Sequence, residues 1–352
     1  MLEFLGEANS SALVGLIGGI ALGLAARIGQ FCTLGAIEDL LYSSDNRRFR
    51  MWGLAIGVAI IGTQLAYHFN HLDIKQTIYL SRVWDPFATI TGGLMFGYGM
   101  ALSGNCGFGA LARLGGGDIR SLLIVIVMGL SAYFIMSGPL AHTRILLFPV
   151  ETNASTPQSF GQLFHLMFDI NTLTTGLFIG VGLIIVSLAN RLMLTSWSTI
   201  FWGFVVGLSI VSGWIGTQWI AAHGFNEEPI VTHSFSAPIG ETILYSMTAS
   251  GNPISFSVGS VLGVVLGAFL GSIFKGQFRW EACDDPRELG RQLFGAVLMG
   301  SGAVLAVGCS IGQGISAFST MAFSAPVAFM MILVGARIGS VSYTHLTLPT
   351  KA

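Results

Sequence analysis

Long apolar segments recur along almost the whole chain, and short polar connections separate them. Each segment is long enough, as an α-helix, to cross the roughly 30 Å hydrocarbon core of a bilayer. The pattern therefore predicts an all-α polytopic membrane protein with about nine transmembrane helices. The apolar segments cover residues 11–31, 51–67, 87–103, 121–138, 172–190, 198–220, 254–274, 290–308 and 323–340.

Composition supports this class and excludes several others. Charged residues make up 9% of the chain and hydrophobic ones 53%, with a mean hydropathy of +0.73. A soluble domain carries roughly 25% charged residues, so this chain cannot cover itself with a water-compatible surface. A lipid bilayer is its expected surrounding. No basic patch indicates a nucleic-acid partner.

The two ends of the chain differ in character. Glu3 and Glu7 precede the first apolar segment, where a secretory signal peptide would carry basic residues, and no small-residue cleavage site follows it. We therefore interpret this segment as a retained helix. Residues 341–352 change abruptly to polar, Thr-rich sequence, which we interpret as a non-native or disordered tail.

Basic residues orient the predicted helices, because short cytoplasmic loops of membrane proteins collect Lys and Arg. Arg47, Arg48 and Arg50 lie in the first connection, and further basic residues lie in residues 275–291. The two longest connections, about 139–171 and 221–253, hold one Arg and no Lys between them. We expect the N-terminus outside and the C-terminus in the cytoplasm, in the inner (plasma) membrane of a bacterium.

Four stretches of the sequence resemble one another, each a Gly-spaced apolar helix followed by a Gly-rich break. Aligned on their last glycine, three of them carry a cysteine three residues earlier, and the other carries Gly213 there. They are GLIGGIALGLAARIGQFCTLG (15–35), GGLMFGYGMALSGNCGFG (92–109), GFVVGLSIVSGWIG (203–216) and GAVLMGSGAVLAVGCSIG (295–312).

The predicted loop charges give the first two stretches one direction through the membrane and the last two the opposite direction. This arrangement is typical of inverted-repeat transporters, whose interrupted helices mark the substrate site. We therefore expect a first half at 1–140, an outer connection at 141–171 and an inverted second half at 172–340, with short re-entrant helices at the breaks.

The cysteines at these breaks are the candidate chemistry. Cys32, Cys106 and Cys309 would each lie beside the N-terminus of a following half-helix, where unpaired N–H groups attract anions. A thiol adds a weak donor and a polarisable sulfur. Such a site favours a soft, sulfur-bearing anion, or a soft cation such as Cu(I). The expected anion cradles comprise Thr33, Gly35, Gly107, Gly109, Ser310 and Gly312.

Three other features leave alternatives open. Arg27 could pair with Glu38 or Asp39 at the cytoplasmic end, or could lend positive potential to the route. The segment 233–242 could be a re-entrant loop that lines an outer vestibule, or a lid. Cys283, in the polar EACDDPRE loop, is expected to have no role in the site.

Three motifs of the chain resemble the YeeE/YedE family of sulfur-transport membrane proteins. They are RIGQFCTLGAIEDLL, ALSGNCGFGALARLGGG and LMGSGAVLAVGCSIGQGISA. The resemblance implies uptake of thiosulfate into the cytoplasm by an hourglass-shaped, pseudo-symmetric helical monomer. It also implies that Cys32, Cys106 and Cys309 pass the ion inward through S–H hydrogen bonds, without a cofactor or a resident metal. A small TusA-like sulfurtransferase is the implied cytoplasmic partner.

Two other functions stay open from the residues alone. One is transport of a selenium species or of another sulfur-containing anion. The other is a membrane sulfurtransferase or thiol enzyme, which needs an activated thiol with a nearby base or resolving thiol. No positioned histidine and no C-x-x-C pair is found, so an enzyme is not expected.

Overall fold

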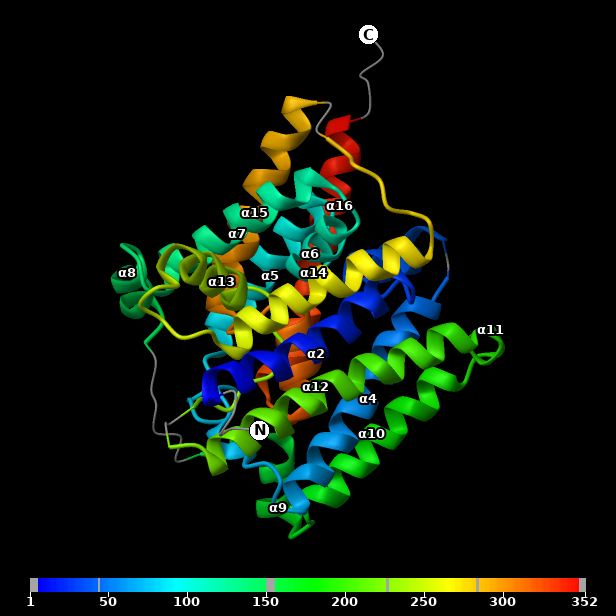
Figure 1. Cartoon of the computed structure of the whole chain (residues 1–352). Helices are drawn as coiled ribbons and strands as arrows, with labels where there is room; N and C mark the ends of the chain where they lie inside the picture. Colours follow the sequence, from blue (N-terminus) through cyan, green and yellow to red (C-terminus); the bar gives the residue numbers. More distant parts are fainter. Residues whose placement is uncertain (1–5, 44, 150–155, 226–227, 283–284, 348–352) are drawn as a thin grey trace.

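The computed structural model describes residues 6–43, 45–149, 156–225, 228–282 and 285–347 (Figure 1). Within these ranges the chain is helical and has no strand, as predicted. The extended pairings found there are isolated bridges, Asp118 with Glu281 and Ser159 with Ala322. Cys283 and the last five residues lie outside the described residues.

Long and short helices are interspersed along the chain. In the N-terminal part they are α2 (Glu7–Arg27), α3 (Thr33–Glu38), the π-helical η1 (Asp39–Ser43), α4 (Arg47–His68), the 3₁₀ turn η2 (Ile74–Gln76), α5 (Pro86–Ser103), α6 (Gly107–Gly115), α7 (Ile119–Met136), α8 (Ala141–Leu147) and α9 (Phe160–Phe168). In the C-terminal part they are α10 (Thr172–Leu188), α11 (Arg191–Leu194), α12 (Trp197–His223), α13 (Ala237–Thr248), α14 (Phe256–Phe274), α15 (Pro286–Leu305), the π-helical η3 (Gly312–Ala317) and α16 (Ser324–Thr347).

Each of the nine predicted apolar segments falls largely on a helix. In the described part of the chain, six helices are long and apolar enough to cross a bilayer: α2, α4, α7, α12, α14 and α16. Helix α10 is apolar but shorter, with 17 residues. Helix α15 starts with a charged turn at Arg287 and Glu288. Nine spans therefore stay a prediction.

One predicted break is wrong. Gly213 lies inside the continuous 27-residue helix α12, so the stretch 203–216 contains no interruption. The chain is instead interrupted further on, between the end of α12 at His223 and the start of α13 at Ala237. Pro238 in the first turn of α13 starts the new helix, because its missing N–H is not needed there. At the C-terminus, α16 continues to Thr347, into the predicted tail.

Glycines bring the long helices into backbone contact. Gly15, Gly19 and Gly23 follow one face of α2, and this face packs on α14. A Cβ atom added at Gly19 would overlap the carbonyl oxygen of Ser260, so α14 leaves no room for a side chain there. In the same way, Gly97 of α5 lies directly on α16. Small residues at such interfaces replace the hydrophobic driving force that helices lack in lipid.

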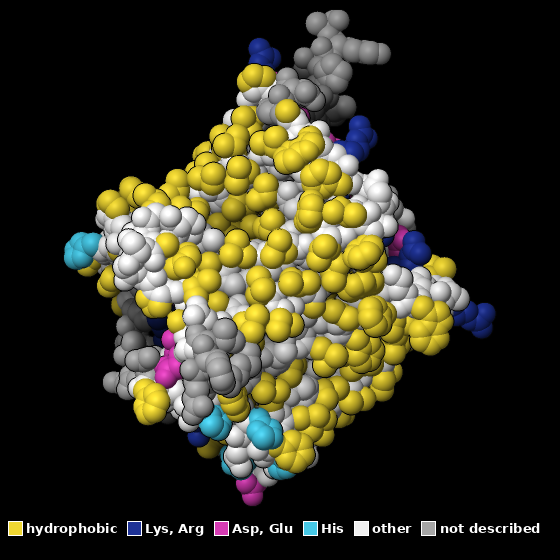
Figure 2. All heavy atoms as spheres, in the orientation of Figure 1, with side chains coloured by type: hydrophobic (Ala, Val, Ile, Leu, Met, Phe, Trp, Pro, Cys, Tyr) yellow, Lys and Arg dark blue, Asp and Glu magenta, His cyan; other side chains and the backbone are white. Residues whose placement is uncertain are grey.

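The outer surface fits a membrane environment. Figure 2 shows a broad hydrophobic face, with the charged and His side chains confined mainly to its margins. Large apolar side chains are exposed on the surface of the described chain, such as Phe178 at 82% and Phe274 at 78%. A soluble monomer does not expose a contiguous apolar area of this kind. The chain is therefore a multi-pass membrane protein.

The α2–α14 contact can be tested by overpacking. We expect Gly19→Val to lower the free energy of unfolding by about 1–3 kcal/mol, because the added carbons meet backbone atoms of α14. Gly182→Val on α10 is the matched control, because nothing lies within 4 Å of a Cβ at that position. The thermal midpoint and the monodisperse fraction in detergent measure the effect. Equal losses in the two variants would contradict the packing described above.

Candidate functional site

The three motif cysteines occupy the same structural position. Each lies in the break between a long helix and a short one, and its thiol accepts the backbone N–H of the residue three positions later. These N···S distances are 3.5 Å for Gly35 to Cys32, 3.4 Å for Gly109 to Cys106 and 3.4 Å for Gly312 to Cys309. This is the contact that an N-capping side chain makes. The spacing Cys-x-x-Gly in the sequence thus corresponds to a thiol-capped helix start.

The backbone before each cysteine also repeats. The residue two positions earlier is left-handed in all three breaks: Gln30 with φ 58°, Gly104 with φ 71° and Val307 with φ 55°. A left-handed residue ends a helix, and it is costly for a β-branched residue such as Val307. Backbone strain of this kind is found where surrounding packing over-determines a functional segment. All three breaks therefore have one geometry, although only one of them has glycine at this position.

The segment 233–236 completes the surroundings of Cys309. The backbone N–H of Phe235 donates to the Cys309 sulfur at 3.2 Å, and the Ser234 hydroxyl lies 3.8 Å from it. The Ser316 hydroxyl, in η3, donates to the carbonyl of His233 and fixes this segment. The segment lies against the thiol and borders the cavity described below, as a segment that lines a vestibule would.

Cys106 lies between the breaks of Cys32 and Cys309. The hydroxyl of Thr33 is 3.9 Å from the Cys106 sulfur, and the side chain of Ser310 lies on another side of it. The Ser310 hydroxyl oxygen is buried and has no well-formed hydrogen bond within the described residues. Buried polar groups are normally paired, so this hydroxyl is available to a ligand. The structure thus brings together Thr33, Cys106 and Ser310 from three distant parts of the sequence.

Aromatic side chains enclose the same region. Phe31 stacks on Trp52 with ring centroids 4.6 Å apart and meets Phe108 edge-on at 6.5 Å. Phe108 in turn packs on Phe235 at 5.2 Å. Each of these rings is at most 2% exposed. The thiols are therefore surrounded by apolar groups, where a polar contact is stronger than it is in water.

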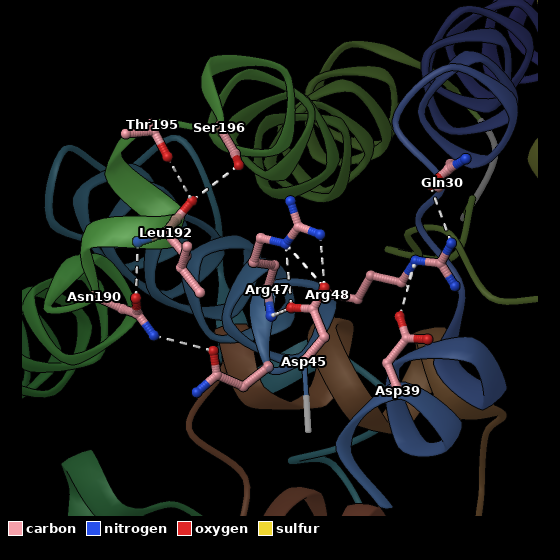
Figure 3. Close-up of polar contacts among 10 residues, drawn as sticks. Gln30, Asp39, Asp45, Arg47, Arg48, Asn190, Leu192, Thr195 and Ser196 are labelled. Carbon is pink, nitrogen blue, oxygen red and sulfur yellow. Dashed lines mark hydrogen bonds and ion pairs between the residues drawn. The ribbon is translucent and has the colours of Figure 1, made fainter. Parts of the chain in front are cut away.

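Arg48 lies beside the Cys32 break, near Gln30 and Asp39 (Figure 3). Its guanidinium donates to the Gln30 side chain at 3.0 Å and forms an ion pair with Asp39 at 3.3 Å. A Cβ atom added at Gly35 would come within 2.8 Å of the same guanidinium. Gly35 is thus needed for close approach of a positive charge to the capped helix start.

The loop before α4 fixes the position of Arg48 (Figure 3). Arg47 donates from two nitrogens to Asp45, at 2.9 and 2.7 Å, and this contact lowers the pKa of the Asp45 carboxyl. The Asn190 side chain donates to Asn46 at 3.2 Å and ties this loop to the start of α11.

The predicted ion pair of Arg27 is not formed. Arg27 donates to the hydroxyl of Ser272 at 2.7 Å and lies against Gly116, whereas Arg48 takes the contact with Asp39. Arg113 lies near Arg27 and donates to the carbonyl of Gly104 at 3.1 Å. Arg27, Arg48 and Arg113 thus bring positive charge to this end of the site from three helices.

A cavity of about 490 Å³ lies at the other end, next to Cys309. Gly308, Ser234 and Gln313 border it on the side of the thiol, and Tyr79 lies close to Gly312. Within the described residues, no three His, Cys, Asp or Glu side chains gather closely enough to hold a metal ion. Cys309 thus lies next to this cavity, and Cys32 lies next to Arg48.

The profile of one protein family matches residues 28–338, and its description is sulphur transport. The chain belongs to the sulphur transport family. This finding confirms the resemblance to YeeE/YedE proteins, which was based on the three cysteine motifs. The matched range contains all three breaks, Arg48 and the residues that line the cavity.

Two curated relatives in the sulphur transport family align with almost the whole chain. The thiosulfate transporter TsuA of Escherichia coli (strain K12) is 25% identical over 346 residues, which cover 93% of each chain. The thiosulfate transporter TsuA of Spirochaeta thermophila is 24% identical over 331 residues, which cover 91% of this chain and 96% of the relative. The chain is therefore a member of a transporter family, and its relatives are named for a sulfur anion.

Sequence reasoning missed several residues of the site. Ser234 and Phe235 were placed only within a vestibule or lid, and Arg48 counted only as an orienting charge. Tyr79 had no signal at all, because its segment has no recognisable motif. A hint for Ser234 was available in the serines and Pro238 of HSFSAPIG, a polar helix start between apolar segments.

The left-handed backbone at Gly104, in the break before Cys106, can be tested by substitution. A Cβ atom at Gly104 would meet nothing within 4 Å, so Gly104→Ala changes only the backbone preference at φ 71°. We expect a loss of about 1–2 kcal/mol. Gly290→Ala is the matched control, since its site in α15 is equally open but helical, and alanine should stabilise it by up to about 1 kcal/mol. Thermal unfolding in detergent measures both; a stabilised Gly104→Ala variant would rule out the left-handed break.

Proposed function

We propose that this protein takes up thiosulfate into the cytoplasm and passes the intact ion along Cys309, Cys106 and Cys32. Membership of the sulphur transport family and the two relatives named for thiosulfate support this function. The observation that carries the proposal is the row of three thiol-capped helix starts between a cavity and an arginine-rich end.

The neighbours of each thiol suggest the order. Cys309 comes first, because Ser234 and Gly308 on either side of it border the cavity. Cys106 follows, because it lies between Ser310 and Thr33. Cys32 comes last, next to Arg48. Thiosulfate would move from one weak site to the next, which a permeating ion requires, since strong binding at any one site would stop transport.

Each site offers the ion two kinds of contact. The terminal sulfur of thiosulfate is soft and polarisable and suits an S–H donor. Its oxygens suit backbone N–H groups at helix starts and free hydroxyls. The buried hydroxyl of Ser310 and that of Thr33 are such donors beside Cys106. The glycines at 35, 107, 109 and 312 keep side chains away from these positions.

We also propose an inverted repeat with a corrected third unit. Its four units are α2–α3–α4, α5–α6–α7, α12–α13–α14 and α15–η3–α16. The packing partners support an exchange of the first unit with the third and of the second with the fourth. Helix α2 packs on α14 as α12 packs on α4, and α5 packs on α16 as α15 packs on α7. In the third unit, Ser236 occupies the place before the short helix that the other units give to cysteine.

We propose an orientation in the membrane and a partner from the same arrangement. The end with Arg48 and Arg113 faces the cytoplasm, following the basic-residue rule, with the N-terminus outside and the protein in a bacterial inner membrane. A TusA-like sulfurtransferase at that end would take the ion, and one copy of the chain would suffice, because the route runs through a single chain. A transporter, and not an enzyme, is the activity proposed.

Growth on thiosulfate as sole sulfur source tests the function, in a host without its own uptake systems. The wild type and a Cys283→Ala control should grow. We expect Cys32→Ala, Cys106→Ala and Cys309→Ala each to slow initial thiosulfate uptake at least about tenfold, the effect of losing one hydrogen bond to a charged group.

Two other outcomes would change the proposal. If a well-expressed wild type fails to support growth, thiosulfate is the wrong cargo, and competition assays with selenium species and other sulfur anions would follow. If all three alanine variants support growth as the wild type does, the cysteines have a packing role only.

A further inference from the structure

Two arginines line the cavity next to Cys309 and have no role in the route described above. Arg82 lies in the connection between η2 and α5, and Arg144 lies in α8. Both side chains border the cavity of about 490 Å³, together with Tyr79, Ser234 and Gln313. The cavity is thus bordered both by two positively charged side chains and by the residues around Cys309.

Both guanidinium groups border the same cavity, so their positive charges share one space. Burial and the charge of Arg82 both lower the pKa of Arg144. The Nε atom of Arg144 is buried and has no hydrogen-bond partner within the described residues. A buried donor without a partner is costly and rare in native structures. Two positive charges at one cavity, together with a buried donor that lacks a partner among the described residues, provide contacts for an anion.

Neighbouring carboxylates do not fill this role. Asp85 borders the cavity, but its side chain accepts the N–H groups of Phe87 and Ala88 and caps α5. Glu241 also borders the cavity. In the described part of the chain, neither carboxylate forms an ion pair or a hydrogen bond with Arg82 or Arg144. Within the described residues, no carboxylate therefore occupies these two guanidinium groups.

We propose that Arg82 and Arg144 form an outer capture site for a small oxyanion of charge −2, which holds thiosulfate by its oxygens before it reaches Cys309. Arginine suits this role because its planar fork donates several N–H groups to oxyanions. With the oxygens held by arginine, the terminal sulfur of the ion is left for the thiol. Clustered positive charge at a cleft also raises the local concentration of an anion and its rate of entry.

This inference rests on the proposed function and adds the step of recognition at the outer mouth. It divides selectivity between two places. The arginines recognise charge and oxygens, which sulfate shares with thiosulfate, and the thiols recognise the terminal sulfur, which sulfate lacks. Sulfate should therefore enter the capture site and compete with thiosulfate, without passing the thiols.

The test measures initial thiosulfate uptake by whole cells over a range of concentrations. We expect Arg82→Gln and Arg144→Gln each to raise the half-saturating concentration about tenfold, with the maximal rate kept, because one charge-assisted contact is lost. Arg82→Lys and Arg144→Lys should recover part of the affinity, because they keep the charge. Arg191→Gln, on the exposed short helix α11, is the control and should behave as the wild type; α8 and α11 lie at opposite sides of Figure 1.

A second measurement separates recognition from folding. Inorganic sulfate should inhibit thiosulfate uptake competitively in the wild type, with an inhibition constant at least about tenfold higher in an Arg82→Gln/Arg144→Gln double variant. Wild-type kinetics in both single variants, or sulfate inhibition unchanged in the double variant, would overturn the capture site. A wild type that takes up no thiosulfate would instead overturn the proposed function, so the two failures are distinguishable.

Discussion

A helix that is interrupted within a membrane leaves backbone N–H groups that lipid cannot satisfy. In this protein a cysteine thiol caps the new helix start at three such places, at Cys32, Cys106 and Cys309. At other helix starts the same chain uses carboxylates, as at Asp85 and Asp118. A thiol is neutral and a weak acceptor, so it holds the helix start without repelling an anion. In the transport that we propose, the remaining N–H groups and the S–H group contact the ion.

The rest of the fold serves to hold these three breaks near one another. Glycine faces let α2 lie on α14 and α5 on α16 at backbone contact, which brings short helices from distant parts of the chain together. Rings of Phe31, Phe108 and Phe235 fill the space around them. Charge is kept to the two ends, with Arg48 at one and the cavity at the other. The middle of the proposed route is thus closely packed with aromatic side chains, and arginines lie at both of its ends.

Much of this was predictable from local sequence. Apolar length predicts helices, and Cys-x-x-Gly after a glycine-rich helix predicts the breaks, because glycine ends helices and leaves room beside them. The predicted break at Gly213 was wrong for a physical reason. Gly213 lies within the continuous helix α12, and glycine in a membrane helix usually serves close packing. Its true break is marked by serines and Pro238 and has no cysteine.

Long-range contacts could not be predicted in this way. Nothing in the neighbourhood of Arg82 or Arg144 in the sequence shows that the two share a cavity, and the contact of Phe235 with Cys309 joins residues far apart in the chain. The left-handed backbone at Gln30 and Val307 was equally hidden, because neither residue type favours it. Such features depend on tertiary packing, which overrides local preference.

Passage of an intact ion is tested most directly in liposomes that contain the purified protein. Thiosulfate is supplied with radioactive sulfur at either the terminal or the central position, and the label that enters is measured. Transport of the intact ion past three thiols predicts equal entry of both labels. Entry of the terminal sulfur alone, with the central sulfur left outside as sulfite, would contradict the account and show sulfur transfer to the protein.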